Sequence, residues 1–165
     1  MKQIIFVIIC IILTGCIQDK SNNDDYDLVR QYEIYKKELV EQTEFQDGSD
    51  EFAIKVIVNK IDDQKKRYDI IIDTPKINMY HLQAIAKVEQ DDTGSLPNLG
   101  ILENDIFSLV PNNIDKSKGI YKGVNLSGIS EKDELNVVVY LTFYRDENSQ
   151  KKEERFIRLY GDEIR

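Results

Sequence analysis

The chain contains few side chains that act as nucleophiles or bind transition metals. Its 165 residues include one histidine and two cysteines, and both cysteines lie among the first sixteen residues. The histidine, His81, stands between Tyr80 and Leu82 at the start of an alternating apolar segment. One imidazole is too few for a usual zinc site, and it becomes a catalytic base only beside an oriented nucleophile. We therefore predict a surface histidine on a strand, with no catalytic residue, metal site or cofactor.

Carboxylates are the remaining candidates for chemistry, and they gather in three clusters. The clusters lie at 62–63, 89–92 and 146–147. An EF-hand loop needs oxygen ligands at alternate positions and a glutamate at the twelfth, and no cluster keeps that spacing. We therefore predict solvated turns, with calcium held jointly by several loops as the alternative. Two carboxylates on either side of a bond also suffice for glycoside hydrolysis.

The charge balance restricts the ligands that the chain can bind. Thirty acidic side chains stand against 22 basic ones, which gives a formal net charge of −8. A nucleic-acid-binding protein neutralises phosphates with a basic surface, and this chain has no excess of basic residues to form one. Nucleic acid is therefore excluded as a general partner.

The first sixteen residues differ in character from the rest. A short start with one lysine precedes an apolar run at 4–13. A membrane-spanning helix takes about 20 apolar residues, so this run has the length of a signal-peptide core instead. The residues that close it, Leu13-Thr14-Gly15-Cys16, resemble the lipobox of bacterial lipoproteins, in which a small residue precedes a lipid-bearing cysteine.

The lipobox resemblance implies cleavage between Gly15 and Cys16, which removes residues 1–15 as a signal peptide. Cys16 then becomes the N-terminus and carries two acyl chains, which are enough for stable anchoring. Cys10 is lost with the signal peptide. The resemblance therefore implies attachment to the cell membrane, on its extracytoplasmic face. The alternative is an uncleaved anchor, or a cysteine that follows a signal peptide by chance.

Two segments are expected between the lipidation site and the main domain. Residues 16–26 are predicted to form a flexible tether, because 18–25 contains no apolar residue. A helix is predicted at 27–45, since apolar residues recur there at spacings of four, three and four: Leu28, Tyr32, Tyr35 and Leu39. The N-terminal cap and the helix dipole favour the acids that precede this stripe: Asp24, Asp25 and Asp27. The stripe is expected to pack on the following domain, and a helix exposed to a partner is the alternative.

Apolar residues at every second position predict strands throughout 50–165. Such segments lie at 52–58, 68–73, 82–89, 106–110, 120–126, 135–144 and 156–160. About seven strands without helix-length segments between them favour a mainly β fold, a single antiparallel β-sandwich preceded by an N-terminal helix. The stretch 126–135 resembles the corner between the fifth and sixth strands of immunoglobulin-like or fibronectin-like domains, which implies an immunoglobulin-like sandwich. A small barrel is the alternative.

The longest alternating segment, 135–144, carries a second row of aromatic and β-branched residues opposite its core positions. Tyr140, Thr142 and Tyr144 share this face with Val138. Tyrosine combines contact area with a polar end, so the row is a candidate partner surface. The alternative, which we favour, is that the predicted helix lies on this face and covers it.

These expectations describe a membrane-anchored extracytoplasmic lipoprotein that acts as a binding module and not as an enzyme. Its partners would be the membrane, through the lipid on Cys16, and another envelope protein. Polyanions are less suitable partners, because the negative net charge repels them. A cell-envelope hydrolase that uses loop carboxylates is the alternative function.

Overall fold

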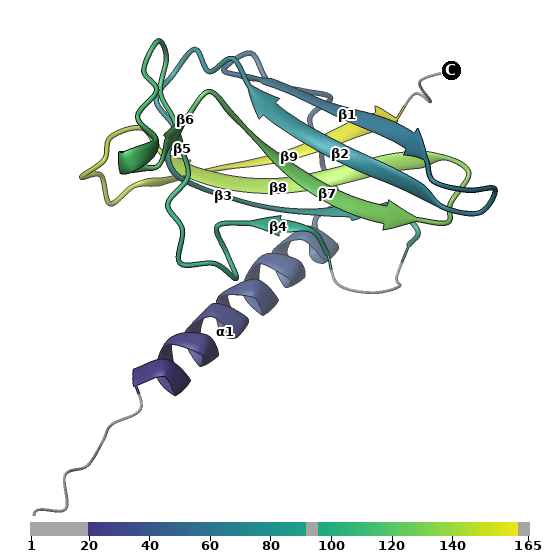
Figure 1. Cartoon of the computed structure of the whole chain (residues 1–165), viewed down its shortest axis with the longest axis horizontal. Helices are drawn as coiled ribbons and strands as arrows, with labels where there is room; N and C mark the ends of the chain where they lie inside the picture. Colours follow the sequence, from purple (N-terminus) through teal and green to yellow (C-terminus); the bar gives the residue numbers. More distant parts are fainter. Residues whose placement is uncertain (1–19, 92–95, 162–165) are drawn as a thin grey trace, which may run out of the picture.

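Two antiparallel β-sheets and one long helix form the architecture of the computed structural model, which describes residues 20–91 and 96–161 (Figure 1). The first sheet has the order β1-β2-β7, with bounds Ala53–Lys60, Lys66–Asp73 and Gly123–Ser130. The second has the order β4-β3-β8-β9, with bounds Asn98–Leu99, Tyr80–Val88, Leu135–Tyr144 and Lys152–Gly161. This confirms the prediction of a mainly β, antiparallel fold with an N-terminal helix.

A short parallel pair closes one end of the molecule. Strands β5 (Ser108–Leu109) and β6 (Ile120–Tyr121) pair with each other, and the 3₁₀ helix η1 (Lys116–Lys118) lies between them in the chain. Met79 pairs with Leu109 and connects this end to the chain just before β3. Strand β5 lies within the predicted segment 106–110, the predicted segment 120–126 is divided between β6 and β7, and β4 was not predicted.

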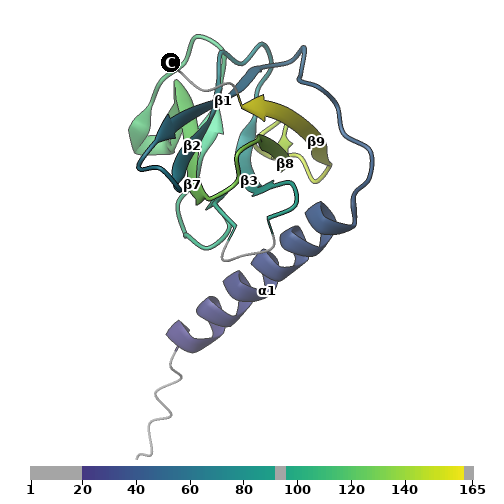
Figure 2. The same ribbon diagram turned by 90° about the vertical axis from the view of Figure 1, so that its right-hand side faces the viewer.

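The core lies between the two sheets and follows the alternation seen in the sequence. One face of β8 contributes every second residue to it: Leu135, Val137, Val139, Leu141 and Phe143. The facing sheet supplies the inward residues of β2, which include Tyr68, Ile70 and Ile72. Because both sheets put apolar side chains into one cluster, they form a sandwich (Figure 2).

The opposite face of β8 is covered by helix α1 (Lys20–Glu41). A second buried cluster joins Tyr32, Tyr35 and Leu39 of the helix to Ile85 of β3 and to Val138 and Tyr140 of β8. The four-stranded sheet is therefore buried on both faces, which explains why β8 is almost uniformly apolar. Figures 1 and 2 both show the first turns of α1 extending away from the sandwich.

The helix boundaries differ from the predicted ones. The helix begins at Lys20, so the prediction of a flexible tether is wrong for residues 20–26, and it ends at Glu41 instead of residue 45. The three aspartates expected near the cap lie inside the helix instead: Asp24, Asp25 and Asp27. The stripe of apolar residues marks only the turns that touch the sheet, and solvated turns give no such signal. Residues 16–19 lie outside the described residues.

The strands run from Ala53 to Gly161, and residues 162–165 lie outside the described part. Within 20–91 and 96–161, no helix combines the length and hydropathy needed to cross a membrane. The apolar run 4–13 and the lipobox residues Gly15 and Cys16 also lie outside the described residues.

Candidate functional site

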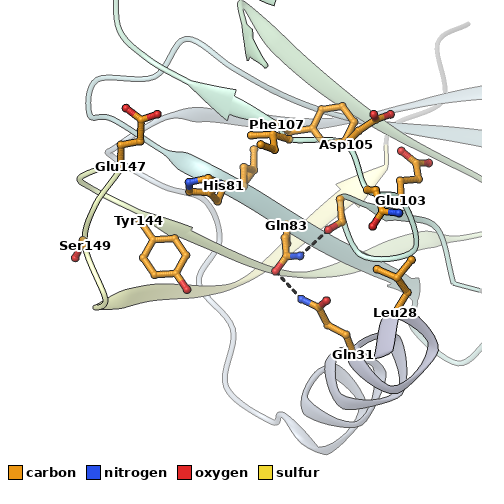
Figure 3. Close-up of a pocket in the computed structure, with 14 residues that line it drawn as sticks. Leu28, Gln31, His81, Gln83, Glu103, Asp105, Phe107, Tyr144, Glu147 and Ser149 are labelled. Atoms are coloured by element: carbon orange, nitrogen blue, oxygen red, sulfur yellow. Dashed lines mark hydrogen bonds between the residues drawn. The ribbon is translucent and has the colours of Figure 1, made fainter. Parts of the chain in front are cut away.

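A pocket of about 490 Å³ lies where the helix meets the end of the four-stranded sheet. Four segments of the chain form it: helix α1, the start of β3, the loop 100–107, and the turn that follows β8. Its size falls in the range of small-molecule sites. Figure 3 shows Gln83 of β3 in the middle of this arrangement, with Gln31 of the helix below it.

A hydrogen-bond network fixes the floor of the pocket. The Gln83 side-chain amide donates to the Gly100 carbonyl oxygen at 2.6 Å, and its oxygen accepts from Gln31 at 3.0 Å and from the Tyr35 hydroxyl at 2.7 Å. The Tyr35 and Thr142 hydroxyl oxygens lie 2.6 Å apart. Burial raises the pKa of Tyr35, so its hydroxyl stays protonated and able to donate. The network joins helix, loop and sheet, and it holds Gln83 in one orientation.

The backbone at Gly100 depends on the absence of a side chain. Its φ is +65°, and a Cβ there would lie 3.0 Å from the Leu82 carbonyl oxygen and 3.3 Å from the Phe107 ring. Glycine adopts this left-handed conformation without steric cost. The turn directs the Gly100 carbonyl to Gln83 and begins the loop that forms one wall of the pocket.

His81 reaches the pocket through an irregularity in β3. The register between β3 and β8 shifts between Tyr80 and Gln83, and His81 has a φ of +51°. A left-handed conformation is uncommon for a residue other than glycine, although histidine tolerates it better than most. The bulge places the imidazole edge-on to the Tyr144 ring, at 6.1 Å between ring centres. The prediction of an ordinary surface histidine on a strand therefore missed its place in the pocket.

The charged residues that line the pocket are acidic. Glu103 and Asp105 come from the loop 100–107, and Glu147 comes from the turn after β8; all three are exposed. In Figure 3, Glu147 lies on the side of Tyr144, and Glu103 and Asp105 lie on the opposite side near Phe107. No lysine or arginine is among the described residues that line the pocket.

Two carboxylates elsewhere in the fold, Glu51 and Glu89, are paired with arginines. Glu51 binds Arg155 at 2.6 Å and also Arg145; partial burial opposes ionisation, but the two guanidinium groups hold the pKa of Glu51 below its usual value. Glu89 accepts two hydrogen bonds from Arg158, at 2.8 and 3.1 Å. By contrast, within the described ranges no side-chain ion pair or hydrogen bond holds a pocket carboxylate. The pocket carboxylates therefore lack the pairing seen at Glu51 and Glu89.

The predicted partner surface is mostly inaccessible. Tyr140 and Thr142 are 3% and 1% exposed, and the Tyr35 and Tyr140 rings lie 5.0 Å apart. The prediction that these residues contact a partner is therefore wrong for both, and the alternative that the helix covers them is confirmed. Tyr144, beyond the covered part, is partly exposed and lines the pocket.

The three predicted acidic clusters take separate roles. Asp62 accepts backbone hydrogen bonds from Gln64 and Lys65 within the β1–β2 turn, Glu89 pairs with Arg158, and Glu147 lines the pocket. Among the residues described, no three acidic, histidine or cysteine side chains are grouped as metal ligands would be. Sequence reasoning missed Gln31, Gln83, Glu103 and Asp105, because their only signal is a polar stretch in a loop and two amides within apolar segments.

Comparison with known proteins gives little further information. No family model and no curated protein matches the chain. One solved structure, a GH20 exo-β-N-acetylglucosaminidase from Vibrio harveyi in complex with N-acetylglucosamine, matches with a TM-score of 0.36 and 10% identity. The match covers 68% of this chain and 18% of that one, and a TM-score this low carries no argument about fold or function.

Proposed function

We propose that this chain is a lipid-anchored extracytoplasmic binding protein that receives an envelope partner in the pocket between helix α1 and the four-stranded sheet. The lipobox-like sequence Leu13-Thr14-Gly15-Cys16 supports the anchor and the location. The observation that carries the binding role is the pocket itself, which four separate segments form and whose walls carry, among the described residues, unpaired polar side chains around a fixed floor. Concave sites with a few convergent polar groups are typical of ligand-binding proteins.

The strand order supports an immunoglobulin-like or fibronectin-like relationship. The first two strands pair in one sheet and the third and fourth lie in the other. The stretch 126–135 carries the chain from β7 of the first sheet to β8 of the second. Sandwiches of this kind commonly place their binding residues on loops at one end, as this pocket does with the loop 100–107 and the turn after β8.

A binding role is better supported than hydrolysis. A glycosidase of the usual kind needs one carboxylic acid that stays protonated, and an apolar, buried environment provides this. Glu103, Asp105 and Glu147 are all exposed to solvent, so none of the three lies in such an environment. The three are therefore suited to hold a ligand by charge and hydrogen bonds.

Lipidation is tested by Cys16→Ser, which removes the thiol that would carry the lipid. We expect uncleaved precursor or release into the medium, measured by cell fractionation and by the mass of the N-terminal peptide. Cys10→Ser is the matched control, because Cys10 would be discarded with the signal peptide. If Cys16→Ser stays with the membrane at the mature mass, the anchor proposal is wrong.

Binding at the pocket is tested by a photo-crosslinking residue placed at Glu103 in living cells. We expect one reproducible adduct at this position. The same residue at Asn59, which is exposed on the outer face of β1, serves as the control and should give no such adduct. Equal products at both positions, or none at Glu103, would contradict a partner at the pocket.

A further inference from the structure

The charges that line the pocket restrict the chemical class of its ligand. This inference rests on the proposed binding function. The floor amide of Gln83 already makes three hydrogen bonds, because its nitrogen donates to Gly100 and its oxygen accepts from Gln31 and Tyr35. The groups left for a ligand are the walls: the carboxylates of Glu103, Asp105 and Glu147, and the rings of His81 and Tyr144.

The wall groups form an environment for a positive charge. Carboxylates approach from two sides of the pocket, and no lysine or arginine among its described lining residues competes for them. In Figure 3 the Tyr144 ring lies on the same side of the pocket as Glu147, across from Glu103 and Asp105, and aromatic rings attract ammonium and guanidinium groups. The protein already uses this contact elsewhere, since the Lys152 ammonium lies 5.4 Å from the centre of the Tyr35 ring.

We propose that the pocket binds an organic cation, a primary ammonium or a guanidinium group, presented either by a free amine or by a lysine or arginine side chain of the envelope partner. The cation lies against Tyr144 on the side of Glu147, and the carboxylates of the loop 100–107 face it from across the pocket. The rest of the ligand fills the remaining volume over the Gln83 floor. A neutral or anionic group of the same size gains none of these charge interactions.

The test is a titration of the full chain in detergent micelles, followed by the amide resonances of the pocket segments. The free cations are cadaverine and agmatine, and the side-chain form is acetyl-Gly-Lys-Gly-amide. Acetyl-Gly-Gln-Gly-amide is the uncharged match. We expect saturable shifts at 81–83, 100–107 and 144–149 with the cations, and at least tenfold weaker binding of the glutamine peptide. Binding of cadaverine without the lysine peptide identifies a free amine as the source, and tight binding of the peptide identifies a side chain.

Paired variants separate a specific site from general attraction to an acidic protein. Glu103→Gln with Asp105→Asn removes two pocket charges and should weaken cation binding about tenfold, because each exposed ion pair contributes a few-fold. Glu131→Gln with Asp133→Asn removes two exposed charges from the β7–β8 turn and should leave affinity unchanged. Equal losses in both pairs, or shifts outside the pocket, overturn the proposal.

Two further outcomes are informative about the proposed function. If the glutamine peptide binds in the pocket as well as the lysine peptide, the cation proposal fails while the binding function stands. If no probe binds but the crosslink from Glu103 forms in cells, the pocket has a partner that it does not recognise through a cation. If no probe binds and no crosslink forms, both the proposed binding function and the proposed cationic ligand are wrong.

Discussion

At the residue scale, one buried pair of hydroxyl groups links the helix to the sheet. Thr142 is 1% exposed, and the Tyr35 hydroxyl is its side-chain partner at 2.6 Å. A buried polar group without a partner costs far more than a satisfied one contributes, so the two residues depend on each other. Tyr35 is also in contact with Tyr140, and the apolar part of its ring fills the space between helix and strand.

A double-mutant cycle tests this dependence. Tyr35→Phe leaves the Thr142 hydroxyl buried and unpaired, and should lower the free energy of unfolding by about 1–3 kcal/mol. In a Thr142→Val background, Tyr35→Phe should lower the free energy of unfolding by clearly less, because residue 142 then has no hydroxyl to leave unpaired. Urea denaturation of the four proteins measures the coupling. A cost of Tyr35→Phe that is the same in both backgrounds would show that the pair is not coupled.

At the element scale, helix α1 acts as the outer layer of the four-stranded sheet. Leu39 is 2% exposed in its contact with the sheet, whereas the neighbouring Val40 is 54% exposed. The sequence predicted this packing from the stripe of four apolar residues, and the strands from their alternation. It did not predict the bulge at His81 or the loop 100–107, because these depend on pairing between segments far apart in the chain.

Adjacent residues of the helix provide a matched test of its packing. Leu39→Ala should lower the free energy of unfolding by about 2–4 kcal/mol, since it removes buried methyl groups and leaves a cavity. Val40→Ala should change it by less than about 0.5 kcal/mol, because Val40 is on the solvent side. Both are measured by urea denaturation. A similar cost at the two positions would mean that the helix does not pack in this orientation.

At the scale of the whole molecule, buried tyrosines make the free energy of unfolding fall as the pH becomes alkaline. Burial, with a smaller contribution from Asp91, raises the pKa of Tyr68 to about 12. Burial also raises the pKa of Tyr140, with the charge of Glu154 adding to the effect. The raised pKa in the folded state means that the unfolded chain loses these protons first as pH rises. The stabilisation is therefore complete below about pH 10 and is lost as pH rises toward 12.

Tyr68→Phe tests this dependence. Between pH 9 and 11 the wild-type protein should lose about 1 kcal/mol of stability through Tyr68 alone, and the variant should lose that much less. Tyr160→Phe is the control, because Tyr160 is 60% exposed. Urea denaturation at pH 9, 10 and 11 gives the slope of the free energy of unfolding against pH for each protein. Parallel slopes for wild type and Tyr68→Phe would exclude Tyr68 as a source of the alkaline loss.

The start of the helix at Lys20 sets the height of the pocket above the bilayer, given a lipid on Cys16. The four residue steps from Cys16 to Lys20 span at most about 14 Å, however they are arranged. The eight helical steps from Lys20 to Leu28, which lines the pocket, add about 12 Å. The pocket wall is then no more than about 26 Å from the anchored residue. With the proposed lipid on Cys16, a helix in place of a loose tether would confine the pocket to ligands near the membrane surface.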